Sequence, residues 1–66
     1  MNREEKIKGL KVLVERNKGK IKKYKKILNE KISIFEREKI EIQYARQLKM
    51  MNSRLERIKK LEEQND

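Results

Sequence analysis

Apolar residues recur at every seventh position along most of this chain, and this spacing constrains its fold more than any other feature. The series consists of Ile7, Val14, Ile21, Leu28, Phe35 and Ile42. Leu10 and Tyr24 each follow a member of the series by three residues, which is the a and d spacing of a coiled coil. No proline interrupts the chain, and most of its abundant residues favour helix. The sequence therefore predicts an all-α protein whose helices pack as in a coiled coil or a helical bundle.

The apolar pattern changes face in the second half of the chain. From Tyr44 onward the apolar residues alternate spacings of four and three, and they are Tyr44, Leu48, Met51, Leu55 and Ile58. At about 100° per residue, Phe35 and Ile42 point well away from the stripe that contains Leu48. A helix over residues 34–45 is therefore apolar on two sides. Either the stripe drifts and a supercoil absorbs the drift, or two neighbouring helices grip this segment as in a bundle.

The sequence contains one clear signal for a helix end. Asn17-Lys18-Gly19 is that signal, because glycine often follows a helix in the left-handed conformation. Asn29 is a weaker candidate, since neither glycine nor proline follows it. We predict one helical unit over residues 1–66 with a possible break near residues 17–20, so that a short helix precedes a long one. The alternative is one continuous rod, in whose packing seam Asn17 could fix the register.

The size of the chain predicts a partner. With 66 residues, of which 47% are charged and 35% hydrophobic, it cannot enclose a large core. Domains of this size bury only about 60% of their unfolded surface, and the usual supports are disulfides, a metal or another chain. The absence of Cys and His excludes disulfides and an ordinary zinc site. We expect a homo-oligomer or a helical partner protein. The residues predicted to pack are Ile7, Val14, Ile21, Leu28, Phe35, Ile42, Tyr44, Leu48, Met51, Leu55 and Ile58.

Positive charge is concentrated in the first half of the chain. Residues 1–33 contain 12 cations and 4 anions, whereas residues 34–66 contain 8 and 7. On a helical wheel one basic strip lies opposite Ile21 and Leu28, and it consists of Lys8, Lys11, Lys18, Lys22, Lys23 and Lys26. The strip is either a solvated face or a contact for a polyanion, which would be nucleic acid or an anionic membrane surface. We favour the contact, because a solvated face would normally include the Glu–Lys pairs that support a helix.

The residue types exclude most catalytic chemistry. The chain has no His or Cys, its one aspartate is Asp66, and its two glycines are isolated, so it has no phosphate-binding loop. We expect no catalytic residue, no cofactor, no metal and no small-molecule substrate. The longest apolar run is Val12-Leu13-Val14, and no apolar signal segment follows the charged N-terminus. We therefore expect a soluble cytoplasmic protein, although an organellar or viral protein would have the same features.

One segment resembles a known family. Residues 36–48 read Glu-Arg-Glu-Lys-Ile-Glu-Ile-Gln-Tyr-Ala-Arg-Gln-Leu, which resembles the core of the FCH segment that opens F-BAR domains. The matching residues are Glu36, Arg37, Ile40, Glu41, Tyr44, Ala45, Arg46 and Leu48. The resemblance implies a long helix after a short one, antiparallel helical dimerisation, and a cationic surface that binds anionic membranes.

Three functional hypotheses follow from the sequence. The first is a non-catalytic α-helical interaction protein that packs its Ile and Leu stripes against partner helices, while its basic half contacts a polyanion. The second is a small basic helical protein that binds DNA or RNA, mainly through charge, because lysine is a point charge and reads little sequence. The third is an FCH-like helix that binds anionic membranes.

Overall fold

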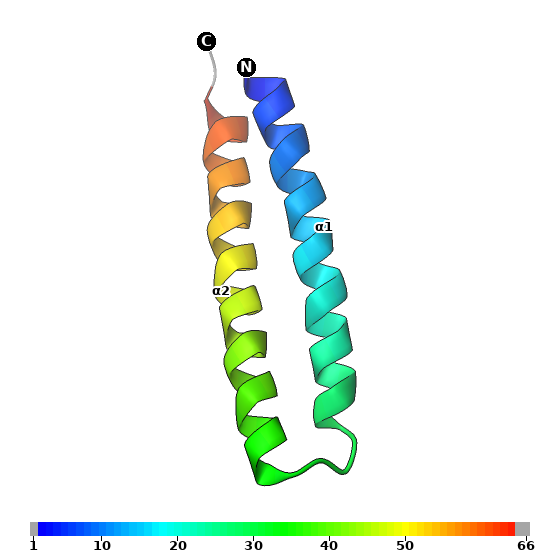
Figure 1. The fold of residues 1–66 in the computed structure, drawn as a ribbon. Coiled ribbons are helices and arrows are strands. Elements are labelled where there is room, and N and C mark those ends of the chain that lie inside the picture. The colour runs from blue at the N-terminus through cyan, green and yellow to red at the C-terminus, as the bar shows by residue number, and fades with distance from the viewer. Residues whose placement is uncertain (1, 65–66) are drawn as a thin grey trace.

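The computed structural model describes residues 2–64, so Asp66 and the outermost residues of the predicted unit 1–66 lie outside it. The described chain forms two α-helices, α1 (Arg3–Leu28) and α2 (Ile34–Glu63), which run antiparallel as a helical hairpin (Figure 1). The hairpin measures 53 × 16 × 14 Å, and Arg3 and Glu63 lie at the same end. The all-α prediction is confirmed, and the partner of each helix is the other helix of the same chain.

Both helices begin at a polar residue that caps the first turn. The side chain of Asn2 accepts a hydrogen bond of 2.8 Å from the backbone N–H of Glu5. Likewise, the Ser33 hydroxyl accepts one of 3.1 Å from the backbone N–H of Glu36. Each cap satisfies a backbone donor that the helix leaves free. In each helix the negative charge of the glutamate is also stabilised by the positive end of the helix dipole. Both helix starts are therefore encoded locally.

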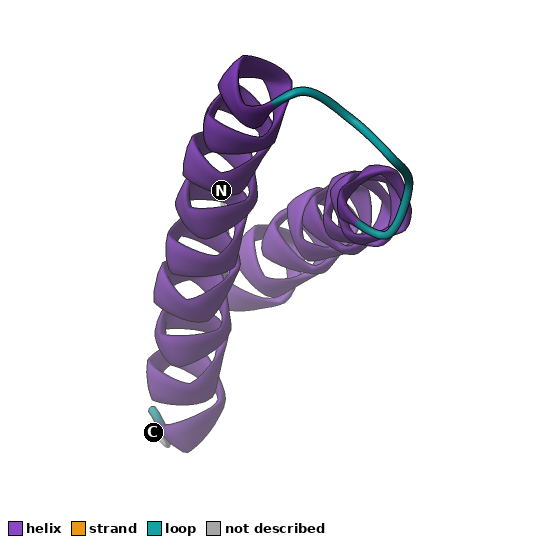
Figure 2. Ribbon diagram, turned by 90° about the horizontal axis from the view of Figure 1, so that it is seen from below, coloured by secondary structure: helices purple, strands orange, loops and turns teal. Residues whose placement is uncertain are grey.

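Helix α1 ends at Asn29 without a glycine. The N–H groups of Asn29 and Glu30 bond to the carbonyls of Lys26 and Ile27, at 3.1 and 3.0 Å, and these three-residue bonds tighten the last turn. The chain then reverses through residues 29–33. Viewed from the loop, the two helices are inclined to one another and the loop spans the distance between their ends (Figure 2).

The predicted break near residues 17–20 is wrong, and so is the continuous rod. Helix α1 passes through Gly19, and neither glycine adopts a positive φ, which a glycine helix end requires. Gly19 costs about 1 kcal/mol within the helix. However, Val14 and Asn17 are buried against α2 just before it and Ile21 is half-buried just after it, and this packing outweighs the cost. The weaker signal, Asn29, is the true helix end.

The core is a single seam between the two helices. Val14 and Ile58 are buried in it together with Asn17, and rows of half-buried residues continue it along both helices. On α1 these are Ile7, Leu10, Leu13, Ile21, Tyr24, Ile27 and Leu28, and on α2 they are Arg37, Ile40, Tyr44, Gln47, Leu48, Met51, Arg54 and Leu61. Most of them are three or four residues apart, which is the spacing of helices packed at a shallow angle.

Candidate functional site

The structure brings together most of the residues predicted to pack, and it leaves three outside. Val14 and Ile58 are buried, and a further group is half-buried along the seam: Ile7, Ile21, Leu28, Tyr44, Leu48 and Met51. By contrast, Phe35, Ile42 and Leu55 are exposed on α2. The intramolecular seam accounts for the first two groups, so any role of the exposed three in packing requires another molecule.

Exposed apolar side chains are concentrated on α2. Within the described residues, the large exposed apolar side chains are Val12, Ile34, Phe35, Ile42, Met50 and Leu55, and only the first belongs to α1. Phe35 is 79% exposed and Ile42, one heptad later, is 54% exposed. Helix α1 therefore covers one of the two apolar sides that the sequence places around residues 34–45 and leaves the other open. The protein is a small helical hairpin with exposed hydrophobic residues, which suggest a partner interface.

A polar network occupies the middle of the seam. Asn17 is 2% exposed, and its side-chain amide donates a 2.6 Å hydrogen bond to Oε1 of Gln47. Its carbonyl oxygen accepts a 2.6 Å hydrogen bond from the guanidinium of Arg54. Closer to the loop, the Tyr24 hydroxyl donates a 2.8 Å hydrogen bond to Oε1 of Gln43. Each of these bonds joins α1 to α2, so they favour one register of the two helices over a slipped one.

The predicted lysine strip lies on solvent-exposed positions of α1. All six of its members are exposed: Lys8, Lys11, Lys18, Lys22, Lys23 and Lys26. Lys11 lies 3.9 Å from Glu62, and Lys18 lies 3.4 Å from Glu15 in the same helix. Such exposed pairs contribute little free energy, because water and salt screen them. Among the described residues no carboxylate pairs with the other lysines of the strip, so their charge is open to an external anion.

Charge and exposed apolar surface coincide at the end of the hairpin that contains the loop. We define this loop end as residues 20–37, which contain seven cations and two anions, a net charge of +5. The cations are Lys20, Lys22, Lys23, Lys25, Lys26, Lys31 and Arg37. Ile34 and Phe35, the two most exposed of the large apolar residues, open α2 within the same segment.

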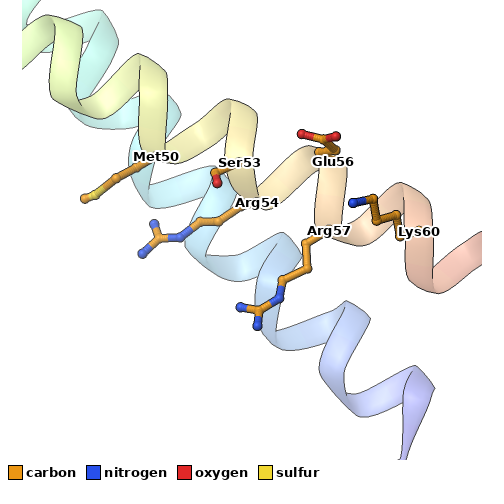
Figure 3. A pocket seen from close by; sticks show the side chains of 6 residues that line it. All are labelled: Met50, Ser53, Arg54, Glu56, Arg57 and Lys60. Carbon is orange, nitrogen blue, oxygen red and sulfur yellow. The ribbon is translucent and has the colours of Figure 1, made fainter.

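One depression on the surface is formed by α2 alone. Its volume is about 520 Å³, and it is lined by Met50, Ser53, Arg54, Glu56, Arg57 and Lys60. All of these residues belong to α2, and Figure 3 shows Arg54 and Arg57 extending to one side of the helix while Glu56 and Lys60 leave it on another. Because one helix surface cannot enclose a small molecule, the depression is open surface.

Neither described helix combines the length and apolarity needed to traverse a lipid bilayer. No family model, curated protein or solved structure matches the chain at a significant level. The resemblance to the FCH segment therefore stays a prediction. In the structure its apolar residues Ile40, Tyr44 and Leu48 are half-buried on α2, while Ala45 is exposed.

Sequence reasoning missed Gln47 and Arg54 as members of the seam and Ile34 as an exposed residue beside the loop. Gln47 and Arg54 continue the spacing of Tyr44, Met51 and Ile58, so a heptad search that admits polar residues finds them. The signal for the second helix was also present, since Ser33 and Glu36 form the Ser-x-x-Glu pattern of a capping box. This pattern predicts a turn that ends before Ser33, and it therefore places Ile34 at the loop end of the hairpin.

Proposed function

We propose that this protein is a non-catalytic helical assembly module that packs the open face of α2 against a helix of a partner and contacts a polyanion through α1. The observation that carries the proposal is the pair Phe35 and Ile42. These residues lie one heptad apart on the side of α2 that α1 does not cover, and they are 79% and 54% exposed. One heptad is the repeat with which a helix presents side chains to a neighbouring helix.

Burial of this pair would be energetically significant. Full burial of an Ile or Phe side chain stabilises by about 1.5–3 kcal/mol. The hairpin itself has few buried side chains, namely Val14, Asn17 and Ile58 among the described residues. A third helix along α2 would add core to a molecule with little of its own. The partner helix comes from a second copy of the chain or from a larger assembly.

The polyanion contact is supported by the distribution of charge on the same fold. Helix α1 carries the exposed strip from Lys8 to Lys26, and the pairs with Glu15 and Glu62 neutralise only Lys18 and Lys11. A partner with phosphate or carboxylate groups would release counterions from this surface, so the affinity should fall as salt rises.

The test of the helix-packing face compares single substitutions at equally exposed sites. Ile42→Ser removes an apolar side chain from the open face of α2, and Val12→Ser is the matched control, since Val12 is 50% exposed on α1. Sedimentation equilibrium measures the mass, and circular dichroism on the same samples measures the helix content across a hundredfold dilution. We expect the wild-type chain to self-associate, Ile42→Ser to weaken the association about tenfold, and Val12→Ser to leave it unchanged.

Two outcomes would contradict this proposal. Equal weakening by both substitutions would mean that general hydrophobicity, not the face containing Ile42, drives association. A wild-type chain that remains a fully helical monomer at every concentration, with a melting temperature that Ile42→Ser does not alter, would exclude the second copy. In that case, chemical crosslinking from position 42 in the native assembly should capture a helical partner. If it captures none, the proposal that this face of α2 packs against a partner helix is rejected.

A further inference from the structure

The loop end combines the two most exposed large apolar side chains of the described chain with a strong excess of positive charge. Ile34 is 76% exposed and Phe35 is 79% exposed, and they are neighbours at the start of α2. Around them, residues 20–37 carry a net charge of +5. The other large exposed apolar residues among those described are less exposed, at 50% for Val12, 54% for Ile42, 41% for Met50 and 42% for Leu55.

The geometry of the pair does not suit a helix partner. Consecutive residues of a helix diverge by about 100°, so one helix lying along α2 covers Phe35 together with Ile42 but does not also cover Ile34. Ile34 and Phe35 both belong to the first turn of α2, immediately after the loop that closes the hairpin (Figure 1). A surface that meets the hairpin end-on contacts both side chains at once. Ile32, half-buried in the loop itself, adds a third apolar residue to this end.

The chemistry of the loop end indicates what such a surface would contain. Exposed isoleucine and phenylalanine side chains are stabilised by transfer into an apolar phase, while the surrounding lysines are stabilised by contact with negative charge. Nucleic acid supplies the charge but offers isoleucine no apolar phase. An anionic lipid bilayer supplies both, with its headgroups at the level of the lysines and its acyl chains beneath them.

We propose that the loop end docks on an anionic phospholipid bilayer, with Ile34 and Phe35 inserted at the interface and the surrounding lysines on the headgroups. This inference rests on the polyanion contact of the proposed function and names the class of polyanion. The hairpin then stands on the membrane by its closed end and presents the face of α2 that contains Ile42 to a partner. Docking requires both signals, because each alone gives only marginal binding to a bilayer.

The expected contributions follow from known magnitudes. Each lysine close to an anionic surface strengthens binding about fivefold. This contribution falls off over a Debye length from the surface, and the Debye length shortens as the salt concentration rises. Removal of one inserted apolar side chain should weaken binding about tenfold. The lysines at the other end of the strip, such as Lys8, lie far from the loop and should contribute little.

The experiment measures co-sedimentation of the full chain with vesicles of phosphatidylcholine mixed with phosphatidylserine, and with vesicles of phosphatidylcholine alone. Ile34→Ser is the test of insertion, and Val12→Ser and Leu55→Ser are controls with exposed apolar residues elsewhere. The double substitution Lys22→Ser and Lys26→Ser tests the charge. Circular dichroism verifies that each variant keeps its helix content, and binding of a short RNA is measured in parallel.

We expect the chain to bind the anionic vesicles and not the neutral ones. Ile34→Ser should weaken this binding about tenfold and the double lysine substitution about 25-fold, while both controls bind as the wild type does. Equal binding by Ile34→Ser and wild type would overturn the end-on insertion. Binding of RNA without binding of vesicles would overturn the membrane inference and leave the polyanion contact standing. If the chain bound neither probe at low salt, both ideas would fail.

Discussion

The two ends of the hairpin differ in what their residues do. At the end with the termini, Val14 and Ile58 are buried and Lys11 pairs with Glu62 across the helices. This terminal end, residues 2–14 and 50–64, contains eight cations and five anions. Among residues 20–37 at the loop end, no residue is buried, the net charge is +5, and the two most exposed large apolar residues of the described chain, Ile34 and Phe35, face solvent. The difference indicates that the terminal end and the middle of the seam hold the fold together, while the loop end is free to contact other molecules.

The most severe test of this comparison is a cavity in the terminal end. Ile58→Ala removes a side chain that is 5% exposed, and we expect a loss of about 2–5 kcal/mol in the free energy of unfolding. In so small a hairpin that loss should unfold much of the population. Leu55→Ala is the control, because Leu55 is 42% exposed on the same helix. Urea denaturation followed by circular dichroism measures both, and equal losses would show that the seam does not run through Ile58.

The polar network in the middle of the seam should have the next largest effect. Asn17→Ala removes the buried member of this network and leaves the half-buried Gln47 and Arg54 without their partner, so we expect a loss of about 1 kcal/mol in the free energy of unfolding. Asn52→Ala, at an exposed position of α2, should change stability by no more than about 0.5 kcal/mol. The same denaturation experiment distinguishes the two, and a neutral Asn17→Ala would mean that the network does not set the register.

A substitution at Gly19 should increase the stability of the hairpin, in contrast to the two losses above. Gly19→Ala should stabilise the hairpin by about 1 kcal/mol, because the residue is helical and nothing lies within 4 Å of an added Cβ. Gly9→Ala is the internal comparison, since Gly9 has equally open surroundings and should give a similar gain. Thermal unfolding measures both variants. A destabilised Gly19→Ala beside a stabilised Gly9→Ala would indicate that the chain does turn near residue 19.

The smallest effect is expected at the loop end. Phe35→Ser should alter the free energy of unfolding by no more than about 0.5 kcal/mol, because the side chain is 79% exposed in the hairpin. The measurement is made at a protein concentration low enough to prevent self-association. A loss as large as that of Ile58→Ala would remove the distinction between a stabilising terminal end and an interacting loop end.

The local sequence determined the class of structure and the helix starts. The seven-residue spacing from Ile7 to Leu28 specifies one face of a helix, and the pairs Asn2–Glu5 and Ser33–Glu36 specify where the helices begin. These features depend on contacts within a turn or two, so they are readable from the chain alone. The end of α1 was harder to predict from the sequence. Its signal, Asn29, lacks the glycine that makes Asn17-Lys18-Gly19 conspicuous.

Only the tertiary structure decided which apolar residues are covered. A heptad pattern shows which side chains share a face, but burial depends on what lies opposite. Phe35 and Ile42 belong to the same seven-residue series as Val14. Once the chain reverses at residues 29–33, Val14 meets α2, whereas Phe35 and Ile42 turn outward. The reversal also made Asn17 part of the seam, because Gln47 and Arg54 are distant in sequence and come within hydrogen-bonding distance only in the hairpin.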